Sequence, residues 1–220
     1  MNNARQFRVG FCISGGGRLF RAAVHHAAQI GIVPALVVAE TKSDPSLAEF
    51  CASKSIDYKS LNPKNRLEFD EHITRLCAVA NLDLLCLTFD RLIPAGLVRH
   101  YRHRIINVHM GLLPAFKGMH ALNAAIESGV RFAGATIHEV DELMDNGAVI
   151  AQCAVGVRRE DTNETIGSRM FVYLRPMFLQ VLRWYSTGRV TRDDKGRIWI
   201  VDGIYGELPI SPSLEDAFSD

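Results

Sequence analysis

The sequence has no apolar run long enough to span a bilayer, and its first eight residues lack the apolar core of a secretory signal. It also has almost no net charge, because 25 Lys and Arg residues against 24 Asp and Glu residues leave +1. A near-neutral chain without a dense basic run gives no reason to expect nucleic acid or a membrane surface as a partner. We therefore expect a soluble, cytoplasmic protein.

Cysteine pairs with metal-site spacing are missing as well. None of the five cysteines belongs to a Cys-x-x-Cys pair, and four of them stand in apolar stretches. This pattern gives little support to a zinc site or a disulfide framework, so we expect no metal. Buried, reduced thiols are the simpler interpretation and indicate a reducing compartment. The five residues are Cys12, Cys51, Cys77, Cys86 and Cys153.

The sequence does have a globular composition, with 48% hydrophobic and 22% charged residues over a length of 220. Its first half alternates apolar runs with amphipathic stretches, which predicts a parallel sheet covered by helices on both faces. We expect an α/β fold with a doubly wound, Rossmann-like, mostly parallel sheet. The expected strands are 7–13, 32–39, 82–87, 105–109, 135–140 and 149–157, and the expected helices are 19–29, 46–54, 65–79, 120–128 and 165–185.

The C-terminal end departs from this alternation. Residues 193–196 are typical of a hairpin turn between two short strands. The tail from Glu207 carries prolines and acids, and we expect it to be loosely packed. Since no repeat or linker divides the chain, we predict a single domain over 1–220, with a core over 1–188 and a C-terminal hairpin and tail over 189–220.

An amide and an imidazole stand at the end of the expected 105–109 strand. Alternate residues of a strand share a face, so Asn107 and His109 point the same way. Both lie at the carboxyl end of a parallel strand, where open α/β sheets bind ligands. An amide N–H can hold a developing oxyanion, and an imidazole can assist when protonated or move a proton when neutral. The pair suits carbonyl chemistry, although ordinary hydrogen-bonding residues are the plain alternative.

An acidic loop over 141–146 stands between two apolar strands. Its Asp145 is followed by Asn146 and Gly147, a turn from which the carboxylate can project. A carboxylate beside an imidazole favours the protonated ring and fixes its orientation. From spacing alone, a solvated hairpin tip is an equal alternative.

Four motifs in order resemble the signature of folate-dependent formyltransferases, and the ordered set is far more specific than any one of them. The resemblance extends from about residue 8 to residue 189 and is strongest to the compact transformylases, which have no added domain. The motifs are Asn-x-His at 107–109, Leu-Leu-Pro-Ala-Phe-Lys-Gly at 112–118, Gly-Ala-Thr-Ile-His at 134–138 and Asp-x-Gly-x-x-Ile at 145–150.

This resemblance implies a catalytic triad of Asn107, His109 and Asp145. It implies direct transfer of a formyl group from the co-substrate 10-formyltetrahydrofolate to an acceptor amine. Asn107 and protonated His109 would stabilise the tetrahedral oxyanion. Asp145 would keep His109 charged and help to move protons.

The resemblance also implies where the two substrates bind, through a pterin slot and a glycine loop at the start of a helix. Exposed N–H groups at a helix start bind anions well, although glycine turns after a first strand are common. The implied folate-binding residues are Phe89, Arg91, Leu92, Ile93, Val140, Asp141 and Glu142. The implied acceptor-binding residues are Ser14, Gly15, Gly16, Gly17, Arg18, Asp90 and Met110.

Because the sequence departs from the transformylase pattern at several positions, it does not identify the acceptor amine. Gly16, Arg18 and Leu19 replace the usual phosphate-loop side chains, and Asp90 replaces an apolar residue. Residues 173–175 lack the glutamate that helps transformylases to hold the substrate amine. We expect a small, anionic amine: an amino acid, an amino sugar or glycinamide ribonucleotide.

Three other functions compete with formyl transfer to a small amine. A formyltetrahydrofolate deformylase would use water as acceptor, but such enzymes usually carry an N-terminal regulatory domain, whereas this chain begins at its first strand. A non-catalytic folate-binding protein is disfavoured by the intact triad. Methionyl-tRNA formylation would need an added RNA-binding domain and a basic surface. As partners we expect a small amine and a reduced folate, and we allow a homodimer.

Overall fold

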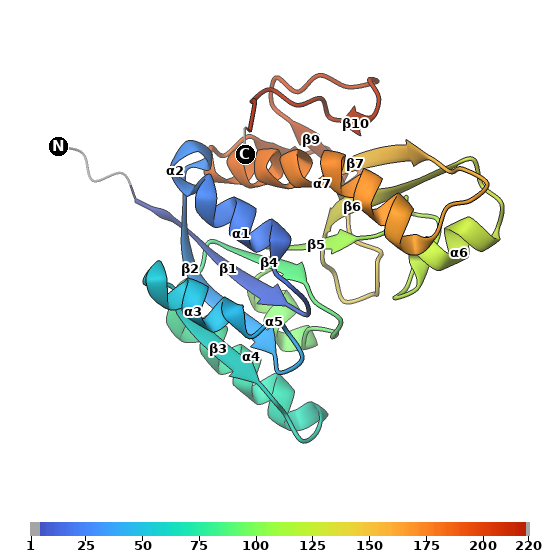
Figure 1. The fold of residues 1–220 in the computed structure, drawn as a ribbon. Helices are drawn as coiled ribbons and strands as arrows, with labels where there is room; N and C mark the ends of the chain where they lie inside the picture. Colours follow the sequence, from blue (N-terminus) through green and yellow to red (C-terminus); the bar gives the residue numbers. More distant parts are fainter. Residues whose placement is uncertain (1–4, 219–220) are drawn as a thin grey trace. The chain divides into compact units, whose positions relative to one another are not determined.

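The computed structural model describes residues 5–218, and its contacts divide the chain into two compact units, 1–106 and 107–220 (Figure 1). Strand β5 (Ile105–His109) carries the chain from the first unit into the second. In the described part of the chain, no helix combines the length and apolar character needed to cross a lipid bilayer. The single domain expected from the sequence stays a prediction.

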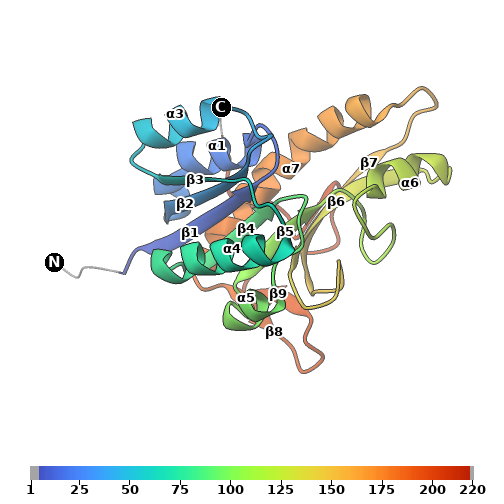
Figure 2. The same ribbon diagram turned by 90° about the horizontal axis from the view of Figure 1, so that it is seen from below.

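The first unit is a parallel sheet flanked by helices. Its strands are β1 (Phe7–Ile13), β2 (Ile32–Glu40), β3 (Asp57–Leu61) and β4 (Leu84–Thr88). Its helices are α1 (Arg18–His25), α2 (Ala27–Ile30), α3 (Ser46–Ser53), α4 (Arg66–Ala80) and α5 (Ala95–His100). The strand order is β4-β1-β2-β3, and α1 and α3 lie on one face while α4 lies on the other (Figure 2). Because both faces are covered, the carboxyl halves of β1 and β2 are buried, as their apolar runs predict.

Local signals set the helix ends in this unit. The side chain of Asn65 caps α4 by accepting a hydrogen bond from Glu68 N at 2.9 Å. The helix predicted over 19–29 is wrong as one element, because the chain leaves helical geometry at His26 and resumes as α2. That second helix ends on Gly31 with a φ of 70°, a left-handed conformation that glycine adopts without strain.

The second unit joins antiparallel strands to a long helix. Its strands after β5 are β6 (Phe132–Glu139), β7 (Val149–Gly156), β8 (Val190–Arg192), β9 (Ile198–Ile200) and β10 (Ile210–Ser211). Its helices are α6 (Ala121–Glu127) and α7 (Asn163–Ser186). β7 pairs with β6 on one side and with β10 on the other. α7 packs on β7 and β6 and begins with a capping box between Thr162 and Thr165.

The C-terminal hairpin is confirmed, but the loosely packed tail is wrong. β8 and β9 pair antiparallel around the predicted turn. Beyond them, Ile210 is only 7% exposed and pairs with Cys153 of β7. The fully buried Gln180 of α7 accepts hydrogen bonds from the backbone N–H groups of Glu215 and Asp216, at 3.1 and 3.0 Å. Buried residues of α7 and β7 therefore hold the tail in place. The amino-acid composition of the tail does not predict these contacts.

All five cysteines are free and buried, as expected from their apolar surroundings. Burial raises the pKa of the Cys77 thiol to about 12, so this thiol is protonated and unreactive at neutral pH. The prediction of buried, reduced thiols is confirmed.

Candidate active site

Asn107, His109 and Asp145 converge within the second unit. Asn107 and His109 are alternate residues of β5, and Asp145 lies in the loop between β6 and β7. His109 is only 6% exposed, with its Nδ1 at 3.5 Å from Asp145 Oδ2 and its Nε2 at 2.8 Å from the Phe116 carbonyl oxygen. Both ring nitrogens therefore face oxygen atoms that can only accept hydrogen bonds.

The loop that carries Asp145 is held in place by its own neighbours. Asp145 has a φ of 49°, in the left-handed region. Its Oδ2 accepts a hydrogen bond from Gly118 N at 2.8 Å, and the next residue, Asn146, accepts one from Lys117 Nζ at 3.1 Å. A bulge interrupts the β6–β7 register at Ile137, close to this loop. Two loops distant in sequence thus fix the carboxylate beside the imidazole.

His138, the last residue of the Gly-Ala-Thr-Ile-His motif, completes this cluster. Its Nδ1 lies 2.7 Å from the Glu139 carbonyl oxygen, which only accepts, so Nδ1 carries the proton. Nε2 is then free to accept from Asn107 Nδ2 at 3.2 Å, and it lies 3.7 Å from Asp145 Oδ1. His138 therefore orients the Asn107 amide and leaves its second N–H for a ligand. The signal for this role was its position on the strand that leads into the Asp145 loop.

Burial lowers the pKa of His138 below its ordinary 6.5, although the Glu139 carbonyl and the Asp145 carboxylate act in the opposite direction. The unfolded chain takes up this proton near pH 6.5, whereas the folded chain takes it up only at lower pH. The neutral ring therefore contributes to the free energy of unfolding above pH 6.5, and this contribution is lost as the pH falls.

We expect the free energy of unfolding to fall less in His138→Gln than in the native chain when the pH is lowered from about 7.5 to about 5. Urea denaturation at both pH values measures this, with the exposed His120→Gln as control. Equal losses in the native chain and His138→Gln would contradict it.

In the first unit, a charged cluster lies at the ends of β1, β2 and β4. It contains two of the residues predicted to bind the acceptor amine. Ser14 Oγ accepts a hydrogen bond from Asp90 N at 2.8 Å, and Asp90 Oδ2 lies 3.2 Å from Lys42 Nζ. Arg91 Nε donates to Glu40 Oε1 at 2.6 Å. Burial alone would raise the pKa of Glu40, but hydrogen bonds from Ser14, Arg91 and Lys42 outweigh it and lower that pKa. Glu40 and Lys42 were missed, although a charge directly after an apolar strand was the available signal.

The remaining predicted residues lie on loops of their own unit, except Arg18, which is the first residue of α1. In the first unit, Phe89 stacks on Phe69 with ring centroids 5.9 Å apart, and Leu92 is 55% exposed. Gly17 is the N-cap of α1, with a φ of 65° at which a side chain would be strained, and a Cβ there would lie 2.8 Å from Leu47 Cδ2. The following residues are exposed: Gly15, Gly16, Arg18 and Glu142. The following are half-buried: Ile93, Met110, Val140 and Asp141.

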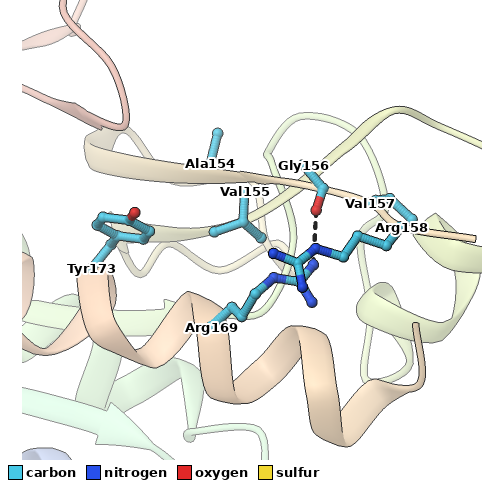
Figure 3. A pocket seen from close by; sticks show the side chains of 7 residues that line it. All are labelled: Ala154, Val155, Gly156, Val157, Arg158, Arg169 and Tyr173. Atoms are coloured by element: carbon cyan, nitrogen blue, oxygen red, sulfur yellow. Dashed lines mark hydrogen bonds between the residues drawn. The ribbon is translucent and has the colours of Figure 1, made fainter. Parts of the chain in front are cut away.

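The second unit also contains a pocket of about 360 Å³ (Figure 3). It is lined by Ala154, Val155 and Gly156 of β7, by Val157 and Arg158 directly after that strand, and by Arg169 and Tyr173 of α7. Arg169 donates to the Gly156 carbonyl oxygen at 2.8 Å, the dashed line in Figure 3. The triad lies at the Val149 end of β7, and a strand of that length separates the two ends by about 23 Å. None of the lining residues belongs to the predicted site.

Comparison with known proteins identifies the family. A family model described as formyl transferase matches residues 7–182. The human trifunctional purine biosynthetic protein adenosine-3 is 32% identical over 204 residues, covering 89% of this chain and 20% of that protein. This chain thus spans about a fifth of the length of that relative.

Two solved structures share the fold. Phosphoribosylglycinamide formyltransferase from Anaplasma phagocytophilum has a TM-score of 0.81 at 30% identity, covering 93% of this chain and 98% of its own. A formyltetrahydrofolate deformylase from Pseudomonas syringae also has a TM-score of 0.81, at 26% identity, covering 90% of this chain and 67% of its own. The mostly parallel, Rossmann-like α/β fold expected from the sequence is confirmed. Because the family model covers most of its length, the chain belongs to the formyl transferase family.

Proposed function

We propose that this chain is an enzyme that transfers a formyl group from 10-formyltetrahydrofolate to the amine of a small, anionic acceptor. One observation carries the proposal: an amide, an imidazole and a carboxylate converge in a member of the formyl transferase family. The three residues are Asn107, His109 and Asp145.

The geometry supports a direct displacement at the formyl carbon. The acceptor nitrogen bonds to that carbon while negative charge develops on the formyl oxygen, where the free N–H of Asn107 and the charge of His109 would stabilise it. The bond to the folate nitrogen then breaks, and the proton lost by the acceptor amine reaches that nitrogen. Asp145 would keep the His109 ring oriented and relay the proton through water.

Residues in each unit suit the flat, polar-edged ring of a reduced folate. In the first unit, exposed Leu92 and half-buried Ile93 offer apolar surface next to the charged cluster around Asp90. In the second unit, half-buried Val140 and Asp141 precede exposed Leu143 at the edge of the Asp145 loop. Apolar side chains beside a few polar groups are typical of small-molecule sites.

The acceptor is proposed to be anionic because an exposed cation and glycine N–H groups lie at the start of α1. Arg18 is exposed at the first position of that helix, directly after Gly17. The long helix α7 has the buried, apolar Leu174 in the stretch where transformylases hold the amine with a glutamate. Phosphoribosylglycinamide is the first acceptor to test, since relatives are named for it, followed by amino acids and amino sugars. Five free, buried thiols fit a reducing compartment such as the cytoplasm.

The proposal is tested by incubating the purified chain with 10-formyltetrahydrofolate and each amine in turn, while both tetrahydrofolate and free formate are measured. We expect tetrahydrofolate release that depends on one anionic amine, with little formate. Formate released at the same rate with and without amine would identify a deformylase instead. Folate binding with neither product would identify a binding protein.

A further inference from the structure

Glu139, the last residue of β6, is a buried carboxylate with no part in the proposed chemistry. Its side chain is 6% exposed and, by strand alternation, lies on the face of β6 opposite to His138. Glu139 Oε1 accepts a hydrogen bond from the Tyr185 hydroxyl of α7 at 2.9 Å and another from Arg192 Nη2 of β8. A carboxylate this far from water requires such partners, and here a long helix and the C-terminal hairpin supply them.

The backbone of Glu139 fixes the entrance of the Asp145 loop. Its N–H donates to the Ala148 carbonyl at 2.9 Å, which closes the loop at its base. Its own carbonyl receives the Nδ1–H of His138 at 2.7 Å. That carbonyl also lies against Gly147, where an added Cβ would come within 1.8 Å of it. The backbone of Glu139 thus determines the position of the Asp145 loop. It also determines the orientation of the His138 ring, which in turn orients the Asn107 amide.

From these contacts we infer that Glu139, Tyr185 and Arg192 act as a clamp that positions Asp145 and His138 for the reaction. The side chains of Tyr185 and Arg192 bind the Glu139 carboxylate on one face of β6. The backbone of Glu139 contacts the Asp145 loop and His138, so the position of Glu139 determines where these residues lie. The hairpin of β8 and β9 is therefore a positioning element of the active site. The role in catalysis rests on the proposed function, whereas the effect on the loop does not.

The first test follows the Gly118 amide, because its hydrogen bond to Asp145 Oδ2 reports the position of the carboxylate. We expect Arg192→Met to speed Gly118 hydrogen exchange by roughly tenfold or more, since a lost buried contact frees the loop. Arg197→Met is the matched control, because Arg197 pairs with Asp193 inside the same hairpin at 2.7 Å. Equal Gly118 exchange in the two variants would overturn the clamp.

A variant with both charges removed covers the case in which Arg192→Met fails to fold. The double variant Glu139→Gln/Arg192→Met leaves no unpaired buried charge, so we expect it to fold. Hydrogen exchange at Gly118 is expected to stay fast in this variant. The side-chain amide introduced at position 139 lacks its guanidinium partner and therefore holds the loop less firmly. Native-like exchange in the folded double variant would also overturn the clamp.

The second test separates positioning from binding. In Arg192→Met, kcat for formyl transfer is expected to fall roughly ten- to a hundredfold, as for a misplaced catalytic group, while KM for the acceptor stays within about twofold. Arg192→Lys keeps the charge and is expected to recover part of kcat, and Arg197→Met to retain all of it. A rise in KM with unchanged kcat would assign these residues to substrate binding and contradict the proposal.

The two proposals fail in different ways. If the native chain transfers no formyl group but Gly118 exchange still responds to Arg192→Met, the clamp stands and the proposed function falls. If the native chain transfers formyl groups and neither Gly118 exchange nor kcat responds, the clamp falls and the function stands.

Discussion

Replacing Asn107 or His109 with alanine is expected to lower kcat for formyl transfer by at least about a hundredfold, because each substitution removes a group that stabilises the oxyanion. The loss of one such donor typically costs about 3 kcal/mol of transition-state stabilisation. Asp145→Asn should give a similar loss, since the amide keeps the Gly118 hydrogen bond but no longer supports a charged imidazole. The measurement is kcat, with thermal unfolding recorded for each variant.

These substitutions should leave the fold intact. Asn107 is half-buried, and the partners it would lose lie within the active-site cluster rather than in the main core. His25→Ala, on the exposed surface of α1, is the control and should keep native turnover. Near-native turnover in both Asn107→Ala and His109→Ala would remove the basis for the catalytic assignment.

Gly147→Ala is expected to lower kcat about as strongly as the loss of a triad member, because a misplacement of about 1 Å can cost roughly a hundredfold. A Cβ at this position would come within 1.8 Å of the Glu139 carbonyl oxygen and 2.6 Å of its carbon. Both atoms belong to the backbone, so no side-chain movement relieves the contact. The base of the Asp145 loop must open, and the carboxylate moves away from His109.

Gly156→Ala is the matched control for that substitution. It lies at the other end of β7, and a Cβ there would meet no atom within 4 Å. We expect this variant to keep native kcat, and both variants to remain folded, because the rest of the β6–β7 pairing is untouched. Native kcat in Gly147→Ala, or an equal loss in Gly156→Ala, would show that the close approach at Gly147 has no role in placing the loop.

Much of the fold could be predicted from the sequence because its buried strands are rich in apolar residues. β1 begins and ends where predicted, since its mostly apolar run, which only Arg8 interrupts, is bounded by polar and glycine residues. α5 was missed because its six residues are too few for a helical period. β10 was missed because only two residues pair, and its partner β7 lies far away in the sequence.

The candidate site was partly predictable for a related reason. Asn107, His109 and Asp145 belong to ordered motifs that stand out within the sequence, whereas the contacts that orient them do not. Asn107 meets His138 across 31 positions, and Glu139 meets Arg192 across 53. Only the fold brings such pairs together, so no local pattern could reveal either contact.

The fate of an isotope-labelled formyl carbon tests the central claim most directly. NMR would follow that carbon from labelled 10-formyltetrahydrofolate in the presence of phosphoribosylglycinamide or another anionic amine. The account predicts that the native chain places the label in a formamide on the amine and that Asp145→Asn does so at least about a hundredfold more slowly. Label that accumulates as free formate, or that reaches the amine equally fast in both proteins, would contradict it.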